Sequence, residues 1–156
     1  MTGGVFFEDL EVGLELISPA RTVTETDIVN YAGVSGDFNI IHTDAEFAKM
    51  TPFGQRIAHG LLGLSIASGL AARSPDVEKH RFVAFLGMTW DFRKPVMIGD
   101  TIRVVQKVAS KKVTKKPGLG VIVFSASLLN QRDELCQEGE WKTLYMMRNW
   151  APPSSE

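Results

Sequence analysis

The amino-acid sequence predicts an α+β fold, in which an antiparallel sheet packs against one central helix. Candidate helices fill the first half of the chain and candidate strands the second half. This order favours a sheet with helices on one face over alternating strands and helices. The most apolar run, IAHGLLGLSIASGLAA at 57–72, has apolar residues on nearly every side and predicts a buried helix. We therefore expect the sheet to curl around residues 57–72.

Length and composition limit the domain count and the class of partner. The chain has 156 residues, 44% of them hydrophobic, which predicts one domain, and we expect a loose tail at 149–156. Its 17 Lys and Arg residues balance 18 Asp and Glu residues, so we expect no nucleic-acid or membrane partner. A lone cysteine, Cys136, and an N-terminus without a secretory pattern predict a cytoplasmic protein.

The N-terminal segments predict a strand followed by a short helix. Residues 14–23 suit a strand that Pro19 interrupts or places at an edge. Thr24 and Asp27 have the spacing of a capping box, and apolar residues follow at helical intervals. Two glycines then weaken the helix, so we expect it to end just before Asp37.

A second short helix and the central helix follow. Thr43 and Glu46 repeat the capping spacing, and Pro52 stops the helix they begin, so residues 37–42 form a linker between two helices. The apolar run at 57–72 would span about 24 Å as a helix, whereas a bilayer crossing needs roughly 20 residues. We therefore assign it to the protein interior.

The second half of the chain has the patterns of four strands. Apolar residues at every second position of 82–92 predict a strand with one fully buried face. Residues 101–109 are rich in β-branched types, and 119–129 are apolar on both faces. Residues 134–148 alternate less cleanly around Gly139, which predicts a bulge there.

The cluster KKVTKK at 111–116 is the one concentrated run of charge. A solvated hairpin is its favoured interpretation, and a contact to a phosphate group is the alternative.

The segment SGDFNIIHTD at 35–44 contains a candidate acid–base pair. Asp37 and His42 lie five positions apart, and a flexible link would let both approach one water molecule. Asn39 could orient the water or the carboxylate, and the isoleucines beside it would exclude solvent. Spacing alone leaves the alternative that Asp37 stabilises a turn and His42 caps its own loop.

Gly60, in AHGLL at 58–62, lies at the start of the central helix. The first N–H groups of a helix lack intrahelical partners and its dipole is positive there, so Gly60 N–H could stabilise an oxyanion. Close packing is the alternative reason for glycine at this position.

The remaining histidines receive weaker assignments. His59 could act as a third imidazole, or form a zinc site with His42 and Asp44, but the spacing matches no metal motif and we predict no metal. His80 stands between two basic residues before a strand, and we expect a solvated surface side chain with no role.

Three motifs together resemble the MaoC-like, (R)-specific enoyl-CoA hydratases. They are YAGVSGDFNIIHTDAEFA at 31–48, AHGLLGLSIASGL at 58–70 and FRKPVMIGDTI at 92–102, and the similarity runs over roughly residues 5–148. The resemblance implies a hot-dog fold, a curved antiparallel sheet around one long helix. It also implies reversible addition of water to a trans-2-enoyl thioester, carried by CoA or acyl carrier protein, without a cofactor.

The resemblance also implies site roles by position. Asp37 and His42 match the catalytic pair, Asn39 the orienting amide, Gly60 the oxyanion N–H, and Ser68 a supporting hydroxyl. We expect Asp37 to take the proton of water and His42 to supply the proton to C2, with the reversed assignment open.

One departure and two rival functions accompany these assignments. Ile40 stands where the family commonly has proline, so the loop loses a φ restraint. A hot-dog thioesterase is ranked lower because residues 57–72 contain no carboxylate. A non-catalytic partner subunit or thioester-binding protein is disfavoured by the intact Asp37 and His42.

We expect a homodimer, which would cover an exposed edge strand.

Overall fold

The computed structural model describes residues 4–75 and 79–151, and its main elements are six strands and four α-helices. A 3₁₀ turn, η1 (Phe7–Asp9), precedes them. The helices are α1 (Glu25–Ser35), α2 (Ile40–Thr43), α3 (Ala45–Lys49) and α4 (Gly60–Ala71). The strands are β1 (Glu15–Ile17), β2 (Arg21–Thr22), β3 (Phe82–Phe92), β4 (Thr101–Val113), β5 (Leu119–Leu129) and β6 (Leu135–Met146).

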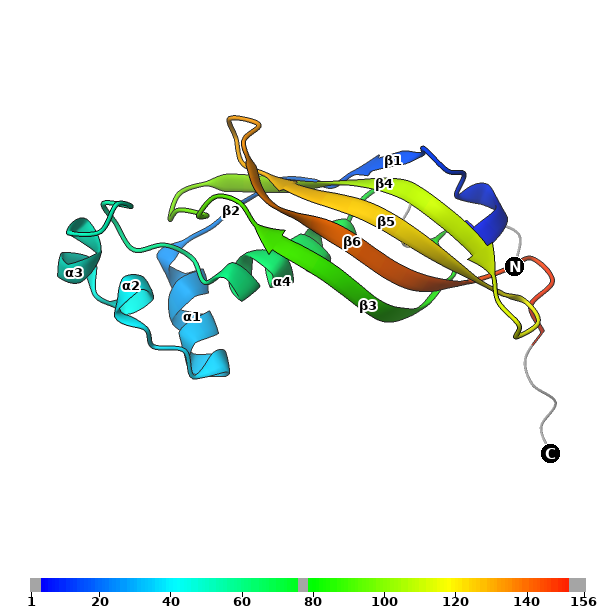
Figure 1. The fold of residues 1–156 in the computed structure, drawn as a ribbon, viewed down its shortest axis with the longest axis horizontal. Helices are drawn as coiled ribbons and strands as arrows, with labels where there is room; N and C mark the ends of the chain where they lie inside the picture. The colour runs from blue at the N-terminus through cyan, green and yellow to red at the C-terminus, as the bar shows by residue number, and fades with distance from the viewer. Residues whose placement is uncertain (1–3, 76–78, 152–156) are drawn as a thin grey trace.

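The strands form one antiparallel sheet in the order β1-β4-β5-β6-β3, with β2 also paired to β4. Figure 1 shows the sheet curving over α4, with α1, α2 and α3 grouped at one end and the β4–β5 turn at the other. The predicted α+β arrangement around a central helix is confirmed. The predicted domain limits, 5–148, stay a prediction, and the structure describes only 149–151 of the predicted tail.

Both predictions for the N-terminal third are confirmed. The strand expected at 14–23 is split into β1 and β2 on either side of Pro19. The Thr24 side chain caps α1, and the carboxylate of Asp27 accepts the Thr24 N–H at 2.8 Å. Gly36 ends the helix with φ 75°, in the left-handed region that glycine tolerates, immediately before Asp37.

The linker between α1 and α3 differs from its prediction in two respects. Residues 37–42 are not all irregular, because α2 begins inside them at Ile40. The cap of α3 is Asp44 rather than Thr43, since Asp44 Oδ1 accepts two backbone N–H groups at 2.9 Å. The Thr43 hydroxyl instead donates backwards to the carbonyl of Phe38 at 3.1 Å. Both neighbours have cap-forming side chains, so spacing alone chose the wrong one.

The central helix is shorter and less enclosed than predicted. α4 begins at Gly60, and the segment before it makes a bridge from Ile57 to Met97. Residues such as Leu62 and Ile66 pack into the core. Leu61 is 57% exposed on the opposite side of the helix, so the sheet of one chain covers one side of α4. Among the described helices, none is long and apolar enough to cross a membrane.

The prediction of a fully buried face on β3 is wrong. β3 is the edge strand beyond β6, and its large apolar side chains are about half exposed, including Phe82, Leu86, Met88 and Phe92. The alternating residues do not all share one face, because Phe82 pairs with Tyr145 whereas Ala84 pairs with the adjacent Leu144. The register also shifts twice against β6 near the start of β3.

Two further strand predictions need correction. Gly139 is not a bulge, because it pairs in regular register with both Trp90 and Ala126. Glycine is required there because a Cβ would overlap the carbonyl oxygen of Thr89. β4 continues to Val113 and takes up half of the 111–116 cluster. The rest enters an exposed turn at the end of the sheet opposite α1, in agreement with a hairpin.

Candidate active site

The described structure gathers Asp37, His42 and His59 into one cluster. Each offers one potential ligand atom, and the three atoms lie within 4.8 Å of one another. Asp37 lies in the loop after α1, His42 in α2, and His59 caps α4. The predicted pairing of Asp37 with His42 in space is therefore present, with a second imidazole beside it.

His42 is held in one orientation by the backbone. Its Nδ1 lies 2.8 Å from the carbonyl oxygen of Ile57. Because a carbonyl only accepts, Nδ1 carries the hydrogen, and Nε2 is the nitrogen left to exchange a proton with a substrate. His42 is half-buried, so a reactant from solvent can approach that nitrogen.

His59 is the buried support of the cluster. It is only 2% exposed, and its Nε2 lies 2.9 Å from the backbone carbonyl oxygen of Asp37. Its ring stacks on that of His42, with centroids 3.8 Å apart and planes at 30°. Its Nδ1 is buried and has no hydrogen-bond partner among the residues that the structure describes. One side chain thus fixes the loop of Asp37 and supports the ring of His42.

The carboxylate of Asp37 serves a turn and remains accessible. Its Oδ1 accepts the backbone N–H of Asn39 at 3.1 Å, so the turn role weighed for Asp37 is present. The residue is exposed, and Oδ2 makes no hydrogen bond to a described residue. The turn therefore orients the carboxylate and leaves one oxygen for chemistry.

Asn39 caps a helix with its side chain. Its Oδ1 accepts the N–H of Ile41 at 3.1 Å, at the start of α2. With the oxygen engaged, the amide nitrogen is the end that can donate outwards to water or substrate. Ile40 is the first residue of α2, so the helix supplies the φ restraint that proline would otherwise provide.

Gly60 lies where the oxyanion role requires it, at the first position of α4 and directly after His59. A Cβ on Gly60 would lie 2.8 Å from the ring of Phe92, so close packing also explains the glycine. The carbonyl of Gly60 accepts a hydrogen bond from Gln137 Nε2 at 3.1 Å. Gln137 Oε1 in turn accepts from the indole of Trp90 at 3.0 Å.

Gln137 is a site residue that the sequence reasoning missed. It is 2% exposed on β6 and anchors the first turn of α4 through Gly60. The sequence signal that could have indicated Gln137 is a polar residue directly after the buried Cys136, in an otherwise alternating strand. Burial raises the pKa of the Cys136 thiol, so this cysteine is a core residue and not a nucleophile.

Ser68 lies apart from the acid–base pair. It stands eight residues beyond Gly60 in α4, about 12 Å along the axis. There it lines a cavity of about 410 Å³ between α4 and the sheet, together with His80. The prediction that His80 is a solvated surface residue is wrong, because it is half-buried and its ring meets Tyr145 edge-on at 6.1 Å.

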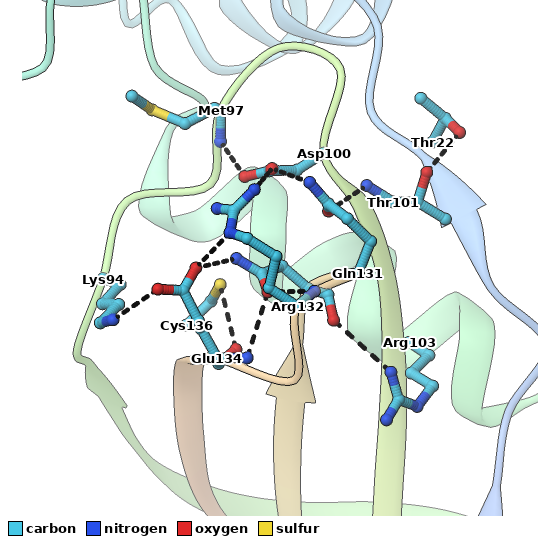
Figure 2. A network of polar contacts seen from close by, with 11 residues as sticks. Thr22, Lys94, Met97, Asp100, Thr101, Arg103, Gln131, Arg132, Glu134 and Cys136 are labelled. Carbon is cyan, nitrogen blue, oxygen red and sulfur yellow. Dashed lines mark hydrogen bonds and ion pairs between the residues drawn. The ribbon is translucent and has the colours of Figure 1, made fainter.

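A polar network fixes the turns behind the site. Figure 2 shows Asp100 and Glu134 joining the β3–β4 and β5–β6 turns. Asp100, only 4% exposed, accepts the N–H of Met97 at 2.9 Å and the amide of Gln131 at 2.9 Å. Met97 bridges to Ile57, the residue whose carbonyl holds His42. The network therefore stabilises the backbone that orients the imidazole.

Glu134 is the most strongly perturbed carboxyl of this network. Hydrogen bonds from Asn130, Lys94 and Arg132 lower its pKa from 4.5 to about 2. The acceptors are Oε2 for Asn130 and Arg132, both at 2.8 Å, and Oε1 for Lys94 at 2.9 Å. Glu134 therefore stays ionised and bridges the two turns at any ordinary pH.

A metal fits the histidine cluster poorly. The lone pairs of an imidazole lie in its ring plane, and two stacked rings direct them along nearly parallel planes instead of towards one ion. The zinc set considered from the sequence also included Asp44, whose carboxylate instead caps α3. The arrangement suits proton transfer better than coordination.

Comparison with known protein families gives one extended match. Residues 11–126 match the family model described as MaoC like domain. A 3-hydroxybutyryl-CoA dehydratase of Methylorubrum extorquens is 42% identical over 67% of this chain and 64% of that protein. An (R)-specific enoyl-CoA hydratase of Rhodospirillum rubrum is 35% identical over 71% of this chain and 74% of that protein. The chain thus spans slightly less than two thirds of the first relative.

Solved structures agree on the fold. A MaoC-like dehydratase from Rhodospirillum rubrum superposes with a TM-score of 0.81 at 27% identity, covering 94% of this chain and 100% of the other. A Mycobacterium tuberculosis protein described as a double hot-dog fold gives a TM-score of 0.81 at 20% identity, over 97% of this chain and 47% of the other. The predicted hot-dog fold is confirmed.

Proposed function

The chain belongs to the MaoC-like domain family, and we propose that it is a hydro-lyase that adds water reversibly to trans-2-enoyl thioesters with (R) specificity. Relatives named 3-hydroxybutyryl-CoA dehydratase and (R)-specific enoyl-CoA hydratase support both the reaction and a CoA thioester substrate. An acyl-carrier-protein thioester is the alternative carrier, since a plant relative is named for that substrate.

One observation carries the proposal: a backbone-oriented imidazole and an accessible carboxylate meet beside the start of α4. His42 donates from Nδ1 to Ile57, which leaves Nε2 for proton transfer. Asp37 lies within reach in the same cluster. The first N–H groups of α4, from Gly60 onwards, have no intrahelical acceptor, so they can bind a developing oxyanion.

In the hydration direction, water adds at C3 and the thioester oxygen gains negative charge. The free carboxylate oxygen of Asp37 would take a proton from the water as its oxygen bonds to C3. His42, protonated at that moment, would give its proton to C2 and collapse the enolate. Gly60 N–H would stabilise the thioester oxygen between these steps. Dehydration reverses each step, so the two residues exchange acid and base roles.

The cavity along α4 is the proposed place for the acyl chain. It has a volume of about 410 Å³, and most of its wall is apolar, including Phe82, Phe85 and Phe124. It lies on the helix whose first turn would hold the thioester oxygen, so a chain attached to that carbonyl can extend into it.

We also propose that the protein is a homodimer. The exposed apolar residues of β3 lie on a sheet edge, where unpaired backbone groups and apolar side chains invite a second strand. Phe38 and Leu61, near the acid–base pair, are likewise 63% and 57% exposed. A partner covering these surfaces would also exclude water from Asp37.

A panel of trans-2-enoyl thioesters on CoA and on acyl carrier protein tests the function. Loss of the conjugated thioester absorbance measures hydration, and thiol release in the same wells measures thioester hydrolysis. Hydration without thiol release is expected. Thiol release would favour the thioesterase, and saturable binding without either change would favour a binding protein, so each outcome decides between the three functions.

A further inference from the structure

The cavity along α4 has a wall that is not uniformly apolar. No Asp, Glu, Lys or Arg among the described residues lines it. Its sheet side combines aromatic rings with the amide of Gln106 and the hydroxyl of Thr143. Its helix side carries the hydroxyl of Ser68. An acyl pocket for a plain hydrocarbon chain has no need of these groups.

Gln106 is a polar residue of the wall whose side chain has no partner among the described residues. It lies within β4 and is only 7% exposed, yet its side chain makes no hydrogen bond to a described residue. The amide retains a small solvent-accessible area, so its hydrogen-bond partner must come from the space beside it. Because Gln106 lines the cavity, that partner would be an occupant of the cavity.

Ser68, an exposed residue of α4, offers a second unengaged group on the opposite wall. Its hydroxyl makes no hydrogen bond to a described residue, whereas Ser65, one turn earlier, donates to the carbonyl of Leu61 at 2.7 Å. Thr143 differs from both, because its hydroxyl already donates to the carbonyl of Ile122 at 3.0 Å. Gln106, Ser68 and the buried indole nitrogen of Trp141, which also lines the cavity and has no partner among the described residues, are therefore the donors that remain available to a ligand.

The titratable groups that line the cavity are Tyr145 and His80. Burial raises the pKa of Tyr145 to about 12, so this phenol stays protonated. Its hydroxyl lies 3.5 Å from Nδ1 of His80, and the two rings meet edge-on. An ionised group brought into the cavity would meet no carboxylate, ammonium or guanidinium group among the described lining residues, and its desolvation would oppose binding.

We propose that the preferred acyl chain carries an uncharged oxygen, a hydroxyl or a keto group, beyond the reacting carbons, and that this oxygen binds between Gln106 and Ser68. The inference rests on the proposed hydratase function and specifies its substrate class. Gln106 can donate to either oxygen and can also accept from a hydroxyl, and Ser68 can do the same. A site built to bond such a group discriminates against chains that lack it.

The test compares matched pairs of substrates. Hexenoyl, octenoyl and decenoyl CoA thioesters are assayed for hydration beside their ω-hydroxy counterparts, with the shorter chains sampling different depths of the cavity. In at least one pair, the hydroxylated substrate should have a kcat/KM higher by about 3-fold to 10-fold, the effect of one net hydrogen bond. Plain substrates that are equal or better at every length would overturn the inference and leave the hydratase function standing.

Failure of the proposed function gives a different result, since no thioester of either type would then be hydrated. An ordered water that satisfies Gln106 without a ligand is also distinguishable, because the plain and hydroxylated chains would then react equally. That outcome overturns the inference as well.

Two variants assign the preference to its residues. Gln106→Met keeps the side-chain length and removes the amide, so the preference for the hydroxylated substrate should fall to parity. Lys107→Met is the control, because its neighbouring side chain is exposed and pairs only with Glu15 at 3.4 Å. Should Gln106→Met not fold, Ser68→Ala on the helix wall should reduce the same ratio. An unchanged ratio in both variants would contradict the assignment.

Discussion

The ring of His59 lies against the ring of His42 with centroids 3.8 Å apart, and its Nε2 contacts the backbone carbonyl of Asp37. A single buried residue therefore sets the distance between the two groups proposed to transfer protons. It belongs to the segment that also carries Gly60. The acid–base pair and the helix start proposed to bind the oxyanion thus all depend on His59. Replacing this residue should therefore affect catalysis more than folding.

Replacing His59 should reduce turnover through misplacement of its neighbours. His59→Leu removes both the ring and the donor, so kcat should fall by about 10-fold to 100-fold, as is usual for supporting residues, with little change in KM. His59→Gln should retain more activity, because its amide nitrogen can reach the place of Nε2 and donate to Asp37. Steady-state kinetics on both variants measure kcat and KM separately. Equal losses in the two variants would show that the donor is irrelevant.

Removing the proton-transfer groups should leave the fold intact. Asp37→Asn keeps an oxygen for the Asn39 N–H, and His42→Asn keeps a donor for the Ile57 carbonyl. Each should lower kcat by about 10²–10⁴-fold. Because both serve the same addition of water across C2 and C3, the double variant should be little worse than either single. Thermal melts accompany the assay, and a sharp drop in melting temperature with preserved turnover would assign Asp37 and His42 to structure alone.

Two reasons for glycine at position 60 can be separated. Gly60→Val should abolish hydration, since a branched side chain would fill the space proposed for the thioester carbonyl. It would also press on the ring of Phe92, which is 54% exposed and able to move. Combining Gly60→Val with Phe92→Ala should restore thermal stability but not activity. Recovery of activity in the double variant would mean that packing alone requires glycine.

Local patterns predicted the elements of the fold well and their environment less well. The alternation in 82–92 correctly predicts β3, but the burial of one face does not follow, because β3 lies at the sheet edge. A periodic apolar pattern predicts a strand with an apolar face. It does not indicate whether the same chain or a partner subunit covers that face. Gly139 similarly reflects the close carbonyl of Thr89, a contact between strands distant in sequence.

The candidate site was predictable where its residues are close in sequence. Asp37 and His42 lie in one segment, and the helix start at Gly60 follows from the apolar run after it. The roles of His59 and Gln137 were not predictable, because each acts through a contact with a residue far along the chain. Ser68 shows the converse, a role implied by resemblance that the structure separates from the pair.

The network of Figure 2 predicts how stability depends on pH. The hydrogen bonds of Glu134 lower its pKa from 4.5 to about 2 in the folded protein. Its contribution to stability is therefore fully present above pH 4.5 and is lost as the pH falls through about 2. Glu134→Gln should melt below the wild type at neutral pH, and the two melting curves should converge on acidification. A difference in melting temperature at pH 2 as large as that at neutral pH would contradict this linkage.

Finally, a charge placed on the edge strand should separate the proposed dimer. Met88 is 50% exposed on β3, outside the residues that line the α4 cavity, so Met88→Glu should leave the cavity intact while opposing the approach of a second apolar edge. Val113 is 56% exposed at the end of β4, remote from that edge, and Val113→Glu is the matched control. Light scattering should show a dimer for the wild type and the control, and a monomer for Met88→Glu. If activity falls with dissociation while the control stays active, the exposed carboxylate of Asp37 depends on the partner subunit to exclude water. A wild-type protein that is monomeric at the concentrations of the assay would disprove the dimer, and hydration by that monomer would show that one chain holds a complete site.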